Sequence, residues 1–215
     1  MIYLKKVVKH FHLVNKHRFY VLKFCLKAGI PFRVLVHDLS KYSYDEFWIS
    51  AANFDGLRSP VTISQKRDGY STVWLHHKGR NKHHFDYWED CDGENRVGVF
   101  VPYKYIVESI CDKLSAGMVY KGKKWSQHDP LDYWNKIDRN NIIVKHPGSV
   151  EFVDIVLKKI YDDGVDAAFH PSYLKKIYDQ VCKKYGIGVG SNGRSWKTII
   201  IVWWWKSKNN VTRLF

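Results

Sequence analysis

Residues 34–47 read VLVHDLSKYSYDEF and contain the adjacent pair His37-Asp38. A neutral imidazole nitrogen is the commonest metal-binding group in proteins, and carboxylates complete sites for harder divalent ions. The pair follows a short run of apolar residues, which predicts that it lies at a buried helix end. A single His-Asp pair is common by chance, so its meaning depends on the rest of the chain.

Helical periodicity dominates the sequence on both sides of this pair. Apolar positions from about 3 to 28 predict a long amphipathic helix that ends at Gly29 and Pro31. A second helix is expected at 32–37. A third should follow, because Ser43 and Glu46 have the spacing of a capping box. Residues 53–69 are rich in turn formers, and CDGENRVG (91–98) is typical of a loop. Further helices are predicted at 72–88, with Gly79 as a weak point, and at 102–117, 130–137, 149–162 and 171–185.

These elements predict an all-α fold, a compact helical bundle over residues 1–165. Residues 166–215 are expected to form an appendage with a helix, a glycine-rich loop and a strand-like segment, WKTIIIVWWWK (196–206). Apolar residues make up 45% of the chain and aromatic residues 16%, which is enough for a substantial core.

The chain is strongly basic, with 35 Lys and Arg against 21 Asp and Glu and a formal net charge of +14. Such an excess attracts polyanions, although a solvated lysine-rich face is an equally good interpretation. The four cysteines have no metal-ligand or disulfide spacing, which favours a reducing compartment. The longest apolar run, IIIVWWW, is too short to span a bilayer. We therefore expect a soluble, cytoplasmic protein.

Four of the eleven histidines lie within nine residues, at positions 76, 77, 83 and 84. If one helix ran through this segment, two neighbouring faces would each carry two imidazoles that could bind one ion. The first face would hold His77, Asn81, His84 and Trp88, and the second His76, Arg80, His83 and Tyr87. The alternative is a solvated or nucleic-acid-facing patch.

Glu108 and Asp112 are one helical turn apart, on the face opposite Ile106, Ile110 and Leu114. Their carboxylates could therefore point into the same cavity as the histidines. Taken alone, Asp112 could be a surface charge and Glu108 an intrahelical partner of a lysine at 104 or 113.

The order His17, His37-Asp38, histidine cluster, Asp112 is similar to the H…HD…H…H…D ligand order of the HD-domain metal-dependent phosphohydrolases. Four segments together resemble an uncharacterised HD-related family of bacterial and phage proteins, and the resemblance covers roughly residues 10–160. They are KHRFYVLK (16–23), GIPFRVLVHDLSKYSYDEF (29–47), WLHHKGRNKHHFDYW (74–88) and VPYKYIVESICDKLSAG (101–117).

The resemblance implies one or two divalent ions, with Mn, Fe, Zn, Ni and Mg equally possible. The implied ligands are His17, His37, Asp38, His77, His83, His84 and Asp112. Asp38, Lys41 and Glu108 are the implied catalytic residues: Lys41 could hold a phosphate oxygen, and Glu108, like Asn81, would face the substrate or stand behind the ligands. Lys41 occupies the last position of the H-D-x-x-E pattern that would indicate a small nucleotidase.

The expected activity is metal-assisted hydrolysis of a small anionic phosphate ester, such as a nucleotide or a nucleic-acid end. An ion in such a site lowers the pKa of water and neutralises charge on phosphoryl oxygens. The alternative is a non-enzymatic nucleic-acid or protein binding module, whose aromatic and cationic side chains would form a docking surface.

Overall fold

The computed structural model describes residues 2–139 and 141–188, and it confirms the all-α fold. The helices are α1 (Ile2–Lys27), α2 (Arg33–Val36), α3 (Tyr44–Ala52), α4 (Pro60–Asp68), α5 (Thr72–Arg80), α6 (Tyr103–Lys121), α7 (Asp129–Tyr133), α8 (Pro147–Asp163), α9 (Val165–Ala168) and α10 (Pro171–Lys184). Short 3-10 turns cover Leu39–Tyr42, Phe85–Trp88 and Gly122–Lys124, and one π turn covers Trp134–Asp138.

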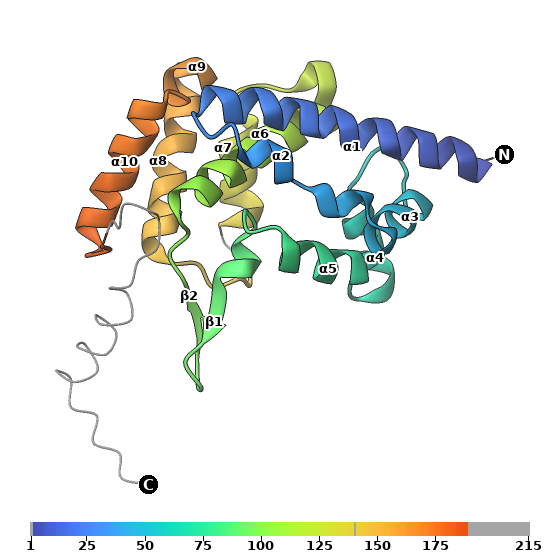
Figure 1. Cartoon of the computed structure of the whole chain (residues 1–215), viewed down its shortest axis with the longest axis horizontal. Helices are drawn as coiled ribbons and strands as arrows, with labels where there is room; N and C mark the ends of the chain where they lie inside the picture. Colours follow the sequence, from blue (N-terminus) through green and yellow to red (C-terminus); the bar gives the residue numbers. More distant parts are fainter. Residues whose placement is uncertain (1, 140, 189–215) are drawn as a thin grey trace, which may run out of the picture.

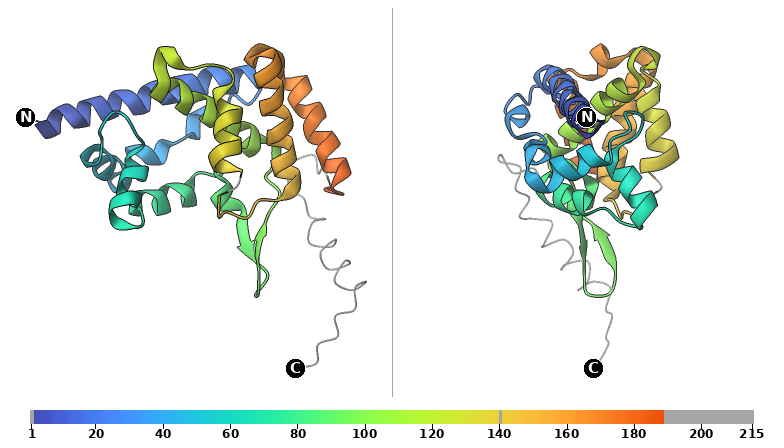
Figure 2. Two further views of the ribbon diagram at one scale, coloured as in Figure 1. Left: turned by 180° about the vertical axis from the view of Figure 1, so that it is seen from behind. Right: turned by 90° about the vertical axis from the view of Figure 1, so that its right-hand side faces the viewer.

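Helix α1 runs along one edge of the molecule and connects its two ends (Figure 1). α1 packs against α6 and, toward its N-terminus, against α3. α8 and α10 lie at the end of the molecule where α1 ends, and α4 and α5 lie toward the end where it begins, as the view from behind also shows (Figure 2). The His37-Asp38 pair follows α2 and so lies between these two ends. A two-stranded antiparallel hairpin, β1 (Glu89–Cys91) and β2 (Arg96–Gly98), projects from the bundle and pairs Glu89 with Gly98.

The main hydrophobic core lies where α1, α6, α8 and α10 meet. Ile106, Ile110 and Leu114 are fully buried along one face of α6, at the four-residue spacing that places side chains on the same side of a helix. Leu174 of α10 is buried in the same core, so the helix that begins the predicted appendage packs against the bundle. The strand-like segment 196–206 lies outside the described residues. None of the described helices is long and apolar enough to cross a membrane.

The helical segment predicted at 72–88 breaks close to Gly79, the predicted weak point, and this break shapes the site. α5 ends at Arg80, and Asn81 has an extended backbone (φ −116°, ψ 97°), so the break falls two residues after Gly79. Residues 81–84 then form a turn before the 3-10 segment Phe85–Trp88. The two helix faces, His77, Asn81, His84 and Trp88 on one and His76, Arg80, His83 and Tyr87 on the next, required one continuous helix, so they do not form.

Three smaller expectations are corrected. Ser43 does precede α3, but its side chain makes no capping bond, and Glu46 turns toward α5 instead, so the capping box is absent. The turn-rich stretch 53–69 contains α4, which begins at Pro60, a residue suited to a first helical turn, and ends at Gly69 with φ 80°. The loop expected at 91–98 is largely the β1–β2 hairpin.

Candidate metal centre

The backbone at Asp38 adopts an unusual conformation. α2 ends at Val36, and Asp38 has φ 52° and ψ 25°, which makes it the one non-glycine residue with positive φ in the described part of the chain. Asp enters this left-handed region more readily than most residues, but the conformation still costs about 1–2 kcal/mol. Such strain concentrates at functional sites. His37 and Asp38 are also 1% and 0% exposed, which confirms the predicted buried position.

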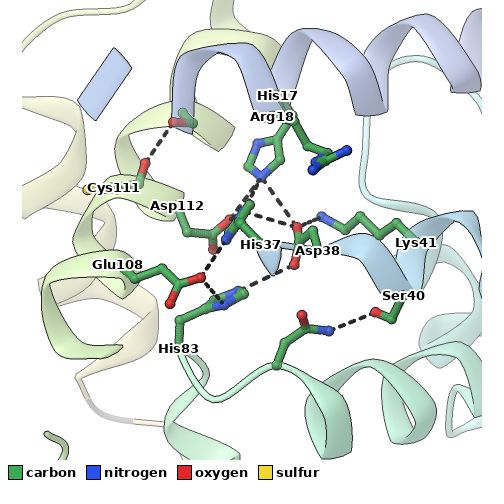
Figure 3. A network of polar contacts seen from close by, with 12 residues as sticks. His17, Arg18, His37, Asp38, Ser40, Lys41, His83, Glu108, Cys111 and Asp112 are labelled. Atoms are coloured by element: carbon green, nitrogen blue, oxygen red, sulfur yellow. Dashed lines mark hydrogen bonds and ion pairs between the residues drawn. The ribbon is translucent and has the colours of Figure 1, made fainter. Parts of the chain in front are cut away.

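The first ligand group consists of His17, His37, Asp112 and the Oδ2 atom of Asp38, and it joins α1, α6 and the residues after α2 (Figure 3). His17 Nε2 lies 3.0 Å from Asp112 Oδ1, 3.4 Å from His37 Nε2 and 3.5 Å from Asp38 Oδ2. His37 Nε2 lies 3.3 Å from Asp38 Oδ2 and 3.7 Å from Asp112 Oδ1. One ligand atom from each of the four residues thus lies within 4.8 Å of the others.

The second ligand group uses the other oxygen of the same carboxylate. Asp38 Oδ1 lies 3.3 Å from His77 Nε2 and 3.5 Å from His83 Nε2. His84 completes this group, and one ligand atom from each of its four residues lies within 4.8 Å of the others. The break after Arg80 makes this possible, because the turn brings His83 and His84 back against His77. Asp38 therefore stands between the two groups, with one oxygen in each.

The spacing of these atoms fits divalent metal ions. Ligand atoms about 2.1 Å from one ion lie roughly 3.0–3.4 Å from one another, which is close to the observed separations. Several buried ligand atoms also make no hydrogen bond within the described residues: Asp38 Oδ1, His83 Nε2 and His84 Nε2. Buried polar atoms are normally satisfied. The donor set therefore suits transition ions that accept nitrogen and oxygen ligands.

Glu108 contacts the Nδ1 atoms of two ligand histidines, on the side of each ring that points away from Asp38. Its Oε1 atom lies 3.0 Å from His37 Nδ1 and 3.4 Å from His83 Nδ1, so it supports one histidine in each ligand group (Figure 3). Arg33 donates to the other oxygen, with its Nε atom 2.6 Å from Oε2. Metal-binding histidines usually give their second nitrogen to a carboxylate, which fixes the ring orientation. Of the two roles predicted for Glu108, this geometry favours the one behind the ligands.

Glu46 performs the same task for the second group. His77 Nδ1 lies 2.8 Å from Glu46 Oε2, and the neighbouring His76 Nδ1 lies 2.6 Å from Oε1. Glu46 is 1% exposed, and it reaches α5 from α3. Sequence reasoning missed this role, as it missed that of Arg33. This role could have been predicted from chemistry, because a metal-binding histidine usually needs a partner for its second nitrogen and Glu46 is a carboxylate close in sequence to the His-Asp pair.

Residues 6–159 match the family of unknown function DUF5662. The chain belongs to this family. Every residue of both ligand groups falls inside the matched segment, as do Arg33, Glu46 and Glu108. No curated protein matches the chain, and no solved structure does. The DUF5662 description assigns no chemistry, so the resemblance to the HD-domain phosphohydrolases stays a prediction.

Electrostatics differ between the two groups of this DUF5662 chain. Burial alone would lower the pKa of His37, but the charges and hydrogen bonds of Asp38 and Glu108 raise it to about 10. Burial lowers the pKa of His83, and burial together with the neighbouring imidazoles holds the pKa of His84 well below its usual range. His83 and His84 therefore keep a free nitrogen lone pair at neutral pH, which is the form that binds metal.

The acidic residues remain ionised despite their burial. Burial raises the pKa of Asp38, but the charges of His37, Lys41 and His77 outweigh it and hold the pKa well below the usual range. Burial raises the pKa of Glu108, but hydrogen bonds from His37, His83 and Arg33 outweigh it and lower the pKa to about 2. The site thus gathers anionic ligands that need cations beside them.

Lys41 supplies one such cation. Its Nζ atom lies 2.5 Å from Asp38 Oδ2, and its side chain is 31% exposed, so it reaches both the carboxylate and solvent. Burial lowers the pKa of Lys41, but the charges of Asp38 and Asp112 raise it above its ordinary value and keep the amine protonated. Asn81, at the end of α5, donates 2.8 Å bonds to Ser40 Oγ and to the His77 carbonyl, which ties the two segments together.

All predicted ligands therefore converge, although by a different route from the predicted helix faces. The alternatives weighed for Glu108 and Asp112 do not describe this structure: Lys113 pairs with Asp138, the Lys104 amine lies over the Tyr105 ring, and Asp112 faces His17. The patch interpretation of the histidine cluster also fails for His77 and His83, because they are 4% and 2% exposed.

Proposed function

We propose that this protein is a metal-dependent phosphohydrolase that binds two divalent ions. The main support for this proposal is the position of Asp38, whose two oxygens face two separate groups of histidines. In addition, the Nδ1 atoms of His37, His77 and His83, which point away from Asp38, face buried carboxylates. His17, His37 and Asp112 would hold one ion, and His77, His83 and His84 the other, with Asp38 shared. Two-ion sites of this kind serve in-line displacement at phosphorus.

The exposure of the ligands indicates where a substrate would approach. His37, Asp38 and His83 are almost fully buried, whereas the Asp112 side chain is 19% exposed and that of Lys41 is 31% exposed. A phosphate group arriving from solvent therefore meets Lys41 first. In our proposal Lys41 exchanges its contact with Asp38 for one with a phosphate oxygen, while Arg33 and Glu108 keep the histidines in place.

Bound divalent ions would lower the pKa of water and neutralise negative charge on the phosphoryl oxygens. The substrate class that fits is a phosphate monoester or diester, such as a nucleotide. The net charge of +14 supports this choice, because a basic surface attracts anionic substrates to a site that is itself rich in carboxylates.

A binding module without catalysis is supported less well. A nucleic-acid surface requires accessible cations, but the network gathers the buried carboxylates of Asp38, Glu46 and Glu108 and the partly buried one of Asp112. Removing such acidic groups from water is expensive unless cations compensate them. Metal binding would explain why they are retained together.

The test is hydrolysis of p-nitrophenyl phosphate, bis-p-nitrophenyl phosphate and nucleoside monophosphates by purified protein after chelation and after adding back Mn²⁺, Zn²⁺ or Fe²⁺. We expect activity that chelation removes, that metal restores, and that Asp38→Asn abolishes. Asn keeps the size of the side chain and its tolerance of positive φ, so the backbone should be preserved. Activity that resists chelation, or a fully active Asp38→Asn protein, would refute the proposal. Metal binding without hydrolysis of any ester would favour the binding module.

A further inference from the structure

Helix α1 carries a face that the bundle leaves uncovered. Its buried side includes Val14, His17 and Val21, which point to the core and the ligand groups. On another side, five large apolar residues are 45–66% exposed: Leu4, Val8, Phe11, Phe19 and Leu26. With 3.6 residues per turn, sequence steps of four, three, eight and seven residues keep all five positions within an arc of about 80°, so they form one stripe along the helix.

A second stripe of lysines runs beside the first. Lys5, Lys9, Lys16, Lys23 and Lys27 are separated by four, seven, seven and four residues, and most of them follow an apolar residue of the first stripe by one position. Within the described residues, Lys5, Lys9, Lys16 and Lys23 make no ion pair, although Lys23 lies over the Phe19 ring. Lys27 pairs with Asp166. The helix contains no acidic residue anywhere in its 26 residues.

The position of α1 makes this surface accessible. The helix lies along one edge of the molecule, and its N-terminal end extends beyond the neighbouring helices (Figures 1 and 2). Helix α2 contacts α1, and two apolar side chains there are also exposed: Phe32, just before α2, at 81%, and Leu35, within it, at 68%. Contiguous exposed apolar surface of this kind marks an interaction site.

The charge pattern selects one class of partner. We propose that α1 docks on the surface of an anionic phospholipid bilayer, with the apolar stripe at the acyl boundary and the lysines among the phosphate headgroups. A helix with an apolar face flanked by lysines is typical of proteins that lie on membranes without crossing them. A second copy of the chain fits poorly, because pairing would bring together two cationic helices without a carboxylate. Nucleic acid would use the lysines but leave Leu4, Val8 and Leu26 without a role.

The experiment is co-sedimentation of the full chain with vesicles of phosphatidylcholine, with and without phosphatidylserine, at low and high salt. We expect binding only when phosphatidylserine is present, and binding that weakens as salt rises. Lys5→Gln, Lys9→Gln and Lys16→Gln together should weaken it by roughly 100-fold, since each lysine near an anionic surface contributes about fivefold. Leu4→Gln, Val8→Gln and Leu26→Gln together should reduce it by a similar factor.

Matched controls are available in the same chain. Lys123, Lys124 and Lys176 are also exposed and make no ion pair in the described residues, while Leu57 and Ile142 are exposed apolar residues in other segments. Glutamine at these positions should leave vesicle binding unchanged, and circular dichroism should show all variants folded. The proposal is overturned if the two lipid compositions bind equally, if the control changes reduce binding as much, or if the chain sediments with single-stranded nucleic acid but not with vesicles.

Discussion

The two ligand groups share Asp38 but differ in origin and in chemistry. The first is assembled from α1, α6 and the residues after α2, which are far apart in the sequence, and it offers two imidazoles and two carboxylates. The second draws its three histidines from eight consecutive residues, 77–84, and has only the shared carboxylate oxygen. The first group is therefore the harder and more anionic site, and the second favours ions that prefer nitrogen ligands.

The largest effect is expected where the two groups meet. Asp38→Asn removes the negative charge from both groups at once, so we expect metal binding to weaken by about 1,000-fold or more at each, beyond the 10–100-fold that loss of a supporting residue costs. Titration calorimetry with Mn²⁺ and Zn²⁺ measures this directly. A variant that keeps one site of normal affinity would show that the groups do not share this carboxylate. Asp132→Asn, an exposed residue outside the site, is the control.

Removing a ligand that belongs to only one group should remove the ion from that group and leave the ion in the other. Asp112→Asn should empty the first group and leave one ion in the second, whereas His77→Gln should do the reverse; each affected site should weaken by about 100-fold or more. Elemental analysis after dialysis counts the remaining ion. His128→Gln, an exposed histidine outside both groups, should retain both ions. If either ligand variant lost both ions, the two groups would have to be regarded as one site.

A finer test uses the two supporting carboxylates. Glu108 contacts one histidine in each group, but Glu46 contacts only His77 among the ligands. Glu108→Gln should therefore weaken both ions by roughly 10–100-fold, and Glu46→Gln only the ion in the second group. Affinities measured by competition with a coloured chelator would distinguish the two patterns. Equal effects of both variants on both ions would contradict the assignment.

The smallest effect concerns a histidine that belongs to neither group. His10 lies two turns before His17 on α1, is 5% exposed, and packs against Phe47 and Phe54 with ring centroids 5.3 and 5.6 Å away. Burial, aided by the Lys41 charge, lowers the pKa of His10 from 6.5 to about 4. The unfolded chain therefore binds a proton that the folded protein excludes between these pH values. The free energy of unfolding should fall by about 3 kcal/mol as the pH drops through this interval.

His10→Phe should remove that part of the pH dependence, because phenylalanine does not titrate and suits the aromatic surroundings. Urea unfolding at pH about 7 and about 5 measures the slope. His12→Gln, at an exposed position on the same helix, should leave the slope unchanged. An unaltered slope in His10→Phe would mean that other groups carry the proton uptake.

The difference between the locally encoded second group and the first group, which is assembled from distant segments, also explains what the sequence could predict. The local cluster of histidines and the buried His-Asp pair are visible in the order of residues, and helical periodicity correctly located α1, α6, α8 and α10. The convergence of His17 and Asp112 on Asp38 depends on how α1 packs against α6, and only the family resemblance indicated it. Hydrophobic periodicity shows which face of a helix is buried, but it does not predict which residues of another helix that face will contact.

The sequence-based expectations differed from the structure where tertiary contacts overrode a local preference. Residues 72–88 have enough helical character to suggest one helix, but the packing of His83 and His84 against Asp38 and His77 requires a turn at Asn81. Glu46 has the right spacing for a capping box, yet it lies under two histidines of α5 that form stronger, charge-assisted bonds. In both cases the demands of the buried site outweigh the local preference.

The most direct test of the central claim is the metal content of the wild-type protein beside Asp38→Asn. Both would be reconstituted with Mn²⁺, Fe²⁺, Zn²⁺ and Ni²⁺ in turn, dialysed and analysed for metal per chain. The account predicts two ions per wild-type chain with at least one of these metals, and none in Asp38→Asn. A wild-type protein that retains no ion under any condition, or equal metal in both proteins, would contradict it.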